Sequence, residues 1–302
     1  MDSHELANSY SLSGQPRRAV PLNLRNAEYD EKHGRKEHLA VGLGNLANKQ
    51  LVIGALNAAE RNLRRQIDLC REITDEFSEA IAHQELGHAL SYRGAWQEAE
   101  TIHERGIELA RKRNNKQIEC VNYASYSAYG ILMKKYSRAI EKGMNSKGQL
   151  ADDSQAYYHA TDYVRAYWLL GAAYRANNEL TLAEENLSKA LNLCRQINLV
   201  DAEADILLDL ARLRYAQGDF KDAQEKASEA LVITERSGYV LQGADVNLFL
   251  AQYALEQEKD KVKAKAYAES ALKLAYCDGP PYYYRVAYEE AEAMLEKLSR
   301  EL

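Results

Sequence analysis

Apolar and polar residues alternate along this chain with the period of an amphipathic helix, and short polar turns interrupt the pattern. Residues 167–174 read YWLLGAAY, and a polar break at Asn177-Asn178 follows. The apolar pattern resumes with Ala183, Leu187, Ala190 and Leu191, three or four residues apart. This spacing predicts two amphipathic helices joined by a short turn. The small residues lie where two helices must cross closely.

The same two-helix pattern recurs through the chain. Each copy has a small residue, here called the anchor, at the start of its second helix. Consecutive anchors are 40, 40, 40, 44, 40 and 41 residues apart. So regular a spacing predicts a stack of equal helical hairpins. The anchors are Ala19, Ala59, Ala99, Ala139, Ala183, Ala223 and Ala264.

The pattern resembles the tetratricopeptide repeat, a helix–turn–helix unit. That signature has an aromatic residue, a Leu-Gly pair and a Tyr on the first helix, here within residues 167–174, and Ala, a bulky residue and Ala on the second. The units are about six residues longer than the usual unit of about 34. Long units of this kind resemble the sensor arrays of STAND signal-transduction ATPases and kinesin-light-chain arrays. The resemblance implies an all-α, right-handed solenoid.

Seven units and a closing helix account for the whole sequence as a single solenoid domain. Each unit is expected to contact only its neighbours, which gives an elongated molecule. A last helix over 282–302 has an apolar face and a charged face, as expected for a C-terminal cap. The units are expected at about 1–34, 35–74, 75–115, 116–153, 154–198, 199–238 and 239–279.

Two places depart from the repeat. The spacing of 44 locates an insertion at residues 149–154, where we expect a bend, and Asp152, Asp153 or Ser154 is expected to cap the next helix. The first unit begins with no polar capping helix before it. Solenoids need end caps, so we expect either a longer parent chain or a cover for this end.

Composition excludes several classes of protein. Residues 1–150 carry a net charge of +3 and the remainder −9, which does not fit a nucleic-acid-binding protein. No apolar run is long enough to span a membrane, and the N-terminus has no signal-peptide pattern. The four cysteines include no CxxC pair, which favours reduced thiols and a cytoplasmic protein.

The sequence offers no convincing catalytic or metal-binding motif. The string from His83 to His88 is similar to the zinc-binding HExxH helix but has one extra residue. A spacing of five puts the two rings roughly 140° apart around a helix, so they cannot share a metal ion. No phosphate-binding glycine loop is present. We therefore expect a non-enzymatic protein without a cofactor.

The resemblance implies that the first helices line a concave groove. Candidate ligand-binding residues follow from counting back equally from each anchor. Groove asparagines in this family often bond the backbone of an extended peptide, and Asn8 and Asn48 share one such slot. The candidates are Asn8, Asn48, Leu51, Gln84, His88, Tyr92, Ala128, Ile131, Arg165, Trp168, Arg175, Asp205, Arg212, Tyr215, Phe249 and Tyr253. The basic clamp of the chaperone-binding members is missing, because its slots hold Gly44, Ala124 and Ala128.

The strongest hypothesis concerns Arg165, Trp168, Arg175, Arg212 and Tyr215. Arginines beside aromatic residues can clamp acidic or phosphorylated groups. If they do so here, replacing Arg175 and Arg212 together would abolish binding without unfolding the array. The alternative is that these arginines only pair with Asp205 or nearby glutamates.

Taken together, these patterns predict a non-catalytic scaffold that binds a protein or peptide in its groove. One alternative is the sensor module of a STAND-type signalling or defence ATPase, with a nucleotide-binding domain upstream in the parent chain. Another is a sensor for a small molecule or a pheromone peptide. The fold alone does not decide among them.

Overall fold

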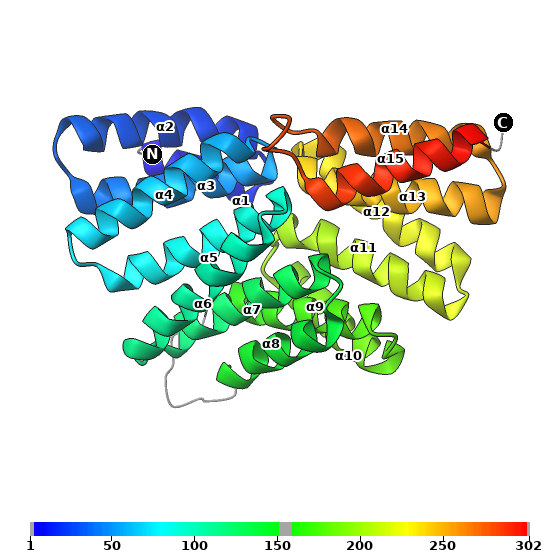
Figure 1. Cartoon of the computed structure of the whole chain (residues 1–302), viewed down its shortest axis with the longest axis horizontal. Coiled ribbons are helices and arrows are strands. Elements are labelled where there is room, and N and C mark those ends of the chain that lie inside the picture. Colours follow the sequence, from blue (N-terminus) through cyan, green and yellow to red (C-terminus); the bar gives the residue numbers. More distant parts are fainter. Residues whose placement is uncertain (1–2, 151–158, 301–302) are drawn as a thin grey trace.

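The structure, a computed structural model, describes residues 3–150 and 159–300. Within those ranges the regular structure is entirely helical, and consecutive helices pair as antiparallel hairpins (Figure 1). None of the described helices is long and apolar enough to cross a membrane. The hairpins are α1 (Ser3–Leu12) with α2 (Pro16–Lys32), α3 (Lys36–Val52) with α4 (Leu56–Glu72), α5 (Glu76–Arg93) with α6 (Trp96–Lys112), α7 (Lys116–Leu132) with α8 (Tyr136–Gln149), α9 (Ala160–Ala176) with α10 (Leu180–Gln196), α11 (Val200–Gln217) with α12 (Phe220–Ser237), and α13 (Val240–Tyr253) with α14 (Lys261–Ala275); α15 (Arg285–Arg300) follows.

The anchors explain why the hairpins are alike. All seven anchor alanines are fully buried where the two helices of a hairpin cross. A larger side chain at that point would push the helices apart. Five residues before each anchor, the turn has a residue with positive φ, such as Gly54 (+80°) or Lys134 (+57°). This shared turn geometry sets the register that the anchor spacing predicts.

The spacing of 41 before the last anchor also has a structural cause. Residues Ala254–Glu258 form a π-helical turn at the end of α13. A π-turn accommodates one extra residue within a helix, so the following hairpin stays in register. The bend expected at residues 149–154 falls mostly on residues 151–158, outside the described residues, as do the caps expected at Asp152, Asp153 and Ser154. The described N-cap of α9 is His159, whose backbone N–H donates to the Asp162 carboxylate over 3.0 Å.

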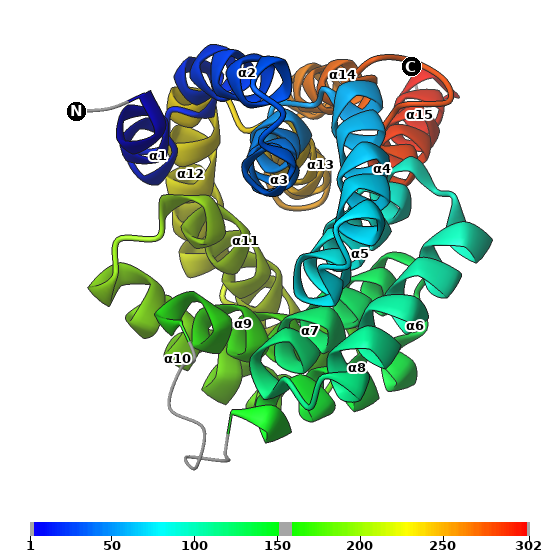
Figure 2. The ribbon, with the colours of Figure 1, turned by 90° about the vertical axis from the view of Figure 1, so that its left-hand side faces the viewer.

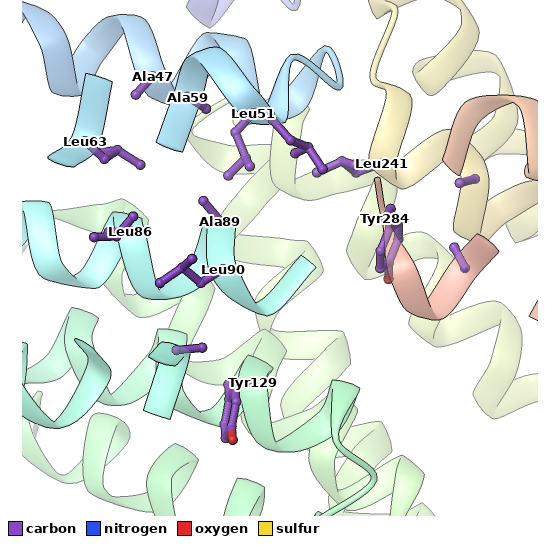
Figure 3. Close-up of a cluster of buried hydrophobic side chains, with 14 of the residues drawn as sticks. Ala47, Leu51, Ala59, Leu63, Leu86, Ala89, Leu90, Tyr129, Leu241 and Tyr284 are labelled. Atoms are coloured by element: carbon purple, nitrogen blue, oxygen red, sulfur yellow. The ribbon is translucent and has the colours of Figure 1, made fainter. Parts of the chain in front are cut away.

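Helices α3, α5, α7, α9, α11 and α13 form the inner wall of a ring, and their even-numbered partners lie outside them (Figure 2). The expectation of an elongated array with contacts between neighbours only is wrong. Helix α3 contacts α13, and α5 contacts α15. One hydrophobic cluster contains both Leu51 of α3 and Leu241 of α13, together with Tyr284 (Figure 3). The last helix begins at Arg285, later than the expected 282.

The tips of the first four hairpins close the ring, and we call this contact the seam. The backbone N–H of Asn57 donates to the Asp278 carboxylate over 2.9 Å. The Lys134 ammonium lies 3.3 Å from the Glu290 carboxylate. The seam consists of the tips around residues 14, 54, 94 and 134 against residues 237–241 and 277–290. Because the tips recur every 40 residues, each contacts a later part of the C-terminal third.

Glycine makes the close approach at the seam possible. A methyl group added at Gly54 would lie 2.7 Å from Cγ1 of Val240, which is closer than real carbon contacts allow. Gly218 holds the same place in its own hairpin with nearly the same φ (+83°). A methyl group there would meet nothing within 4 Å. The two glycines therefore share a backbone requirement and differ in the seam contact.

We expect Gly54→Ala to be more destabilising than Gly218→Ala. Both variants lose about 1 kcal/mol because alanine disfavours positive φ. Only the first also crowds Val240, which adds about 1–3 kcal/mol or forces the seam open. Urea unfolding measures the difference, and small-angle X-ray scattering detects opening as a larger radius of gyration. Equal stability and equal radius for the two variants would contradict a closed seam.

Candidate ligand cavity

The ring encloses a cavity of about 800 Å³. Its wall consists mainly of side chains from the inner helices α3, α5, α7, α9, α11 and α13, and α15 closes one side. Helix α7 contributes the small side chains Ala124, Ser125 and Ala128, which leave room beside the larger groups on α5 and α9. The cavity therefore takes its residues from nearly every repeat and depends on the seam for its closure.

Most of the residues chosen from the sequence line this cavity. Two do not. Asn8 is exposed on α1, short of the stretch of that helix that reaches the wall. Tyr253 is buried against Tyr215 and Phe249 in the core between repeats. The predicted residues that line the cavity are Asn48, Leu51, Gln84, His88, Tyr92, Ala128, Ile131, Arg165, Trp168, Arg175, Asp205, Arg212, Tyr215 and Phe249. Their role in binding remains a prediction.

Asp209, which the sequence analysis did not select, organises the arginine cluster. Its carboxylate accepts a hydrogen bond from the Trp168 indole N–H over 2.9 Å. It also lies 3.1 Å from the Arg175 guanidinium and 3.6 Å from that of Arg212. Arg212 in turn lies 3.9 Å from Asp245. The signal in the sequence was the spacing of Asp201, Asp205 and Asp209, which puts three carboxylates on one face of α11.

These ion pairs bear on the prediction that Arg175 and Arg212 clamp an acidic ligand. Arg175 and Arg212 are engaged with Asp209 and Asp245, rather than with Asp205 or a glutamate as the alternative supposed. Replacing both arginines would leave Asp209 a buried carboxylate without an ion pair, which is strongly destabilising. Any loss of binding in that double variant would be confounded by loss of stability.

Two other cations in the cavity are free of such partners. Within residues 3–150 and 159–300, Lys49 of α3 and Arg165 of α9 form no hydrogen bond or ion pair. Burial lowers the pKa of Lys49, while the charges of Glu85 and Asp201 raise it. Burial, and to a lesser extent the charge of Arg165, lowers the pKa of His88 to about 4. His88 is therefore neutral near pH 7, and the unpaired positive charge belongs to Lys49 and Arg165.

Glu85 shows that this part of the wall is incompletely paired. The Asn48 amide donates to Oε1 of Glu85 over 2.6 Å, so Asn48 is engaged within the wall. The other oxygen, Oε2, is buried and has no partner among the described residues. Burial raises the pKa of the Glu85 carboxyl to about 7, against the hydrogen bond from Asn48 and the charges of Lys49 and Arg165.

The cavity edges and the histidine string have simpler roles. The Tyr215 hydroxyl donates to Glu256 and accepts from the Gln257 amide over 2.9 Å, which holds it at the rim.

His83 is buried and its ring bonds the Glu79 carbonyl over 2.8 Å, while His88 lines the cavity. Among the described residues no three His, Cys, Asp or Glu side chains are grouped so as to hold a metal ion.

We expect Glu85→Gln to have a higher free energy of unfolding than the wild type, by an amount that grows as pH rises. The folded carboxyl keeps its proton up to about pH 7, while the unfolded one loses it near 4.5. Stability of the wild type therefore falls between about pH 4.5 and 7, and the neutral amide avoids that loss, worth up to about 3 kcal/mol. Urea unfolding from pH 5 to 8 measures the difference. The exposed Glu28→Gln variant is the control, and identical pH profiles for the two variants would contradict the assignment.

Comparisons with known proteins bear on this architecture. Residues 162–236 match the sequence profile of the tetratricopeptide repeat family. A search of curated protein sequences gives no match. The repeats matched by the profile are the fifth and sixth hairpins, α9–α10 and α11–α12, which carry the arginine cluster and the three aspartates of α11.

Solved structures share the fold over most of the chain. A Rap protein in complex with competence and sporulation factor is similar with a TM-score of 0.59 and 10% identity, over 88% of this chain and 75% of that one. Aspartyl phosphate phosphatase F from Bacillus subtilis gives a TM-score of 0.52 and 12% identity, over 90% and 73%. A STAND protein with a tetratricopeptide repeat sensor from Pyrococcus horikoshii gives 0.56 and 14%, over 99% of this chain and 48% of that one.

These identities support a likeness of fold alone. The fold, the buried anchors and the profile match agree with one another. Residues 162–236 match the tetratricopeptide repeat family, and the described chain as a whole has the fold of a tetratricopeptide-repeat solenoid with long units.

Proposed function

We propose that this chain is a non-catalytic binding protein that holds a short peptide in its central cavity. The observation that carries the proposal is the set of polar groups on the cavity wall that lack partners, above all Lys49, Arg165 and Oε2 of Glu85. Buried polar groups are nearly always paired in proteins. Oε2 of Glu85 is such a buried atom, and the half-buried Lys49 and the exposed Arg165 lie on the same cavity wall, which supports a ligand that bonds to this part of the wall.

The size and closure of the cavity favour a small ligand over a folded partner. A volume of about 800 Å³ falls in the range of ligand pockets, about 300–1,000 Å³. The seam joins the first repeats to the last and so closes the long open side through which a folded domain would enter an open solenoid. A short extended peptide fits both the volume of the cavity and the closure of the ring. A small molecule of similar size would use the same wall.

Arg165 and Lys49 are the residues proposed to hold an acidic group of that peptide, such as its terminal carboxylate. Arginine can bind a carboxylate through two parallel hydrogen bonds. The small residues of α7, including Ala124 and Ala128, leave space for the peptide backbone along the same wall. The shared fold of the Rap protein that was solved with competence and sporulation factor supports a ligand-receiving solenoid of this shape.

A second proposal places the chain in a larger signalling protein. The fold of the STAND protein with a tetratricopeptide repeat sensor covers 99% of this chain, which spans about half of that protein's length. In such a protein the peptide cavity would act as the sensor for a nucleotide-binding domain elsewhere in the parent chain. The full reading frame decides this: a phosphate-binding glycine loop upstream would support the sensor role, and a frame without one would exclude it.

The proposed compartment is the cytoplasm. Cys70, Cys120, Cys194 and Cys277 are all free thiols, and the first three are buried. Burial raises the pKa of each of them to about 12, so they stay protonated and unreactive. These thiols suit a reducing environment and have no role in the proposed binding.

We expect Arg165→Gln to abolish most peptide binding without loss of stability. The wild type is incubated with a random pool of pentapeptides, and the retained peptides are counted by mass spectrometry. Retention should fall by about tenfold or more in the variant, because a buried carboxylate loses its charged partner. Stability should hold, because Arg165 forms no ion pair that its removal would break.

The matched control is Arg61→Gln, which removes an arginine exposed on the outer helix α4. It should retain the pool as the wild type does. Equal retention by Arg165→Gln and Arg61→Gln would remove Arg165 from the site. No retained peptide with the wild-type protein would contradict the peptide function itself.

A further inference from the structure

One part of the cavity wall carries more negative charge than its own cations balance. Helix α11 places Asp201, Asp205 and Asp209 one turn apart, and Asp245 follows on α13; all four line the cavity. Asp209 is balanced by two arginines. Asp245 faces Arg212 at 3.9 Å and accepts a hydrogen bond from the Tyr284 hydroxyl over 3.1 Å. Within the described ranges, Asp201 and Asp205 have no ion pair.

Gln242 supplies a separate observation at the same place. Its amide N–H donates to Oδ2 of Asp205 over 3.4 Å. This bond fixes which way the amide lies, since turning it would set two acceptor oxygens against each other. Oε1 of Gln242 is then buried in the cavity wall with no donor in the described chain, and the residue is only 8% exposed. A buried acceptor without a donor costs about 1–3 kcal/mol.

The neighbouring side chains do not supply a hydrogen-bond donor to Oε1 of Gln242. The Tyr284 hydroxyl is already committed to Asp245. Tyr92 lines the same wall, and its ring packs against those of His88 and Tyr284, each with centroids 4.8 Å apart. The acidic pocket, defined as Asp201, Asp205, Gln242 and Tyr92, therefore presents several acceptors and an aromatic ring. Lys49 faces it at Asp201, while Asp205 has no ion pair among the described residues.

We propose that the acidic pocket holds a positively charged group of the ligand, the guanidinium or ammonium of a basic peptide residue. Asp205 supplies the counter-charge, Oε1 of Gln242 accepts a further N–H, and the Tyr92 ring offers a cation–π contact. The inference rests on the proposed peptide function and names the chemistry of the peptide. A ligand that satisfies both ends carries an acidic group toward Arg165 and a basic group toward Asp205.

The pKa values of the carboxyl groups at the pocket agree with this assignment. Burial, and then the charges of Asp245 and Asp209, raises the pKa of Asp205 well above its usual range. Burial raises the pKa of Asp245 to about 6, against Arg212 and the Tyr284 hydrogen bond. A cation bound in the pocket would lower both pKa values and favour the charged carboxylates.

The test compares two pools of N-acetylated pentapeptides with free carboxyl ends. Every peptide of one pool contains a single arginine, and citrulline replaces that arginine in the other. Citrulline keeps the shape of the side chain and removes its charge. The wild-type chain should retain the arginine pool about tenfold or more over the citrulline pool. Asp205→Asn should lose this preference, and Gln242→Leu should reduce it.

Asp68→Asn is the matched control, because it removes a carboxylate exposed on the outer helix α4. It should keep the wild-type preference, and circular dichroism checks that each variant is folded. Equal retention of both pools by the wild type, or an arginine preference that survives in Asp205→Asn, would overturn the inference and leave the peptide function standing. Retention of neither pool would overturn both.

Discussion

The contact between the tips of the first four hairpins and the last helices determines what this solenoid can do. Without it, the inner helices would form an open groove accessible to large partners. With it, Leu51 and Leu241 share one hydrophobic cluster, although they are far apart in the sequence. The seam is made of a few polar contacts and closely packed backbone, so closure depends on small residues at the tips. The cavity and its electrostatics follow from that closure.

Charge is distributed unevenly inside the ring. Asp209 gathers Trp168, Arg175 and Arg212 into a self-compensated group, which stabilises the wall and leaves little for a ligand. Among the described residues, the cavity groups without an ion pair are Lys49 on α3, Arg165 on α9 and Asp205 on α11. A protein that only needed a stable core would have paired these groups or replaced them with apolar residues. Their persistence in one cavity is the physical basis for proposing a ligand with two opposite charges.

The sequence predicted the repeats well because the anchor has a local cause. A small residue at a helix crossing recurs in every unit and is visible without coordinates, whereas the positive φ of the turn residue at Lys134 and Lys259 is visible only in the structure. The candidate wall residues followed from the same register. Tyr253 failed because the count back from Ala264 crosses the extra residue of the π-turn, so that the preceding residue, Gln252, lines the cavity instead; Asn8 failed because the cavity wall begins later on α1. The closure of the ring could not be predicted from the sequence, since it joins residues about 160–220 positions apart. The sequence could not show which arginines lack an ion pair. That depends on the contacts of Asp209 with Arg175 and Arg212, which only the side-chain geometry reveals.

The central claim is that a peptide occupies the cavity rather than the outer surface. Amide hydrogen exchange, measured with and without the peptides that the protein retains from a random pentapeptide pool, tests it most directly. The account predicts slower exchange in the inner helices α5, α9 and α11 on binding, with the outer helices α4 and α12 unchanged. Protection confined to the outer helices, with α5, α9 and α11 unaffected, would contradict it.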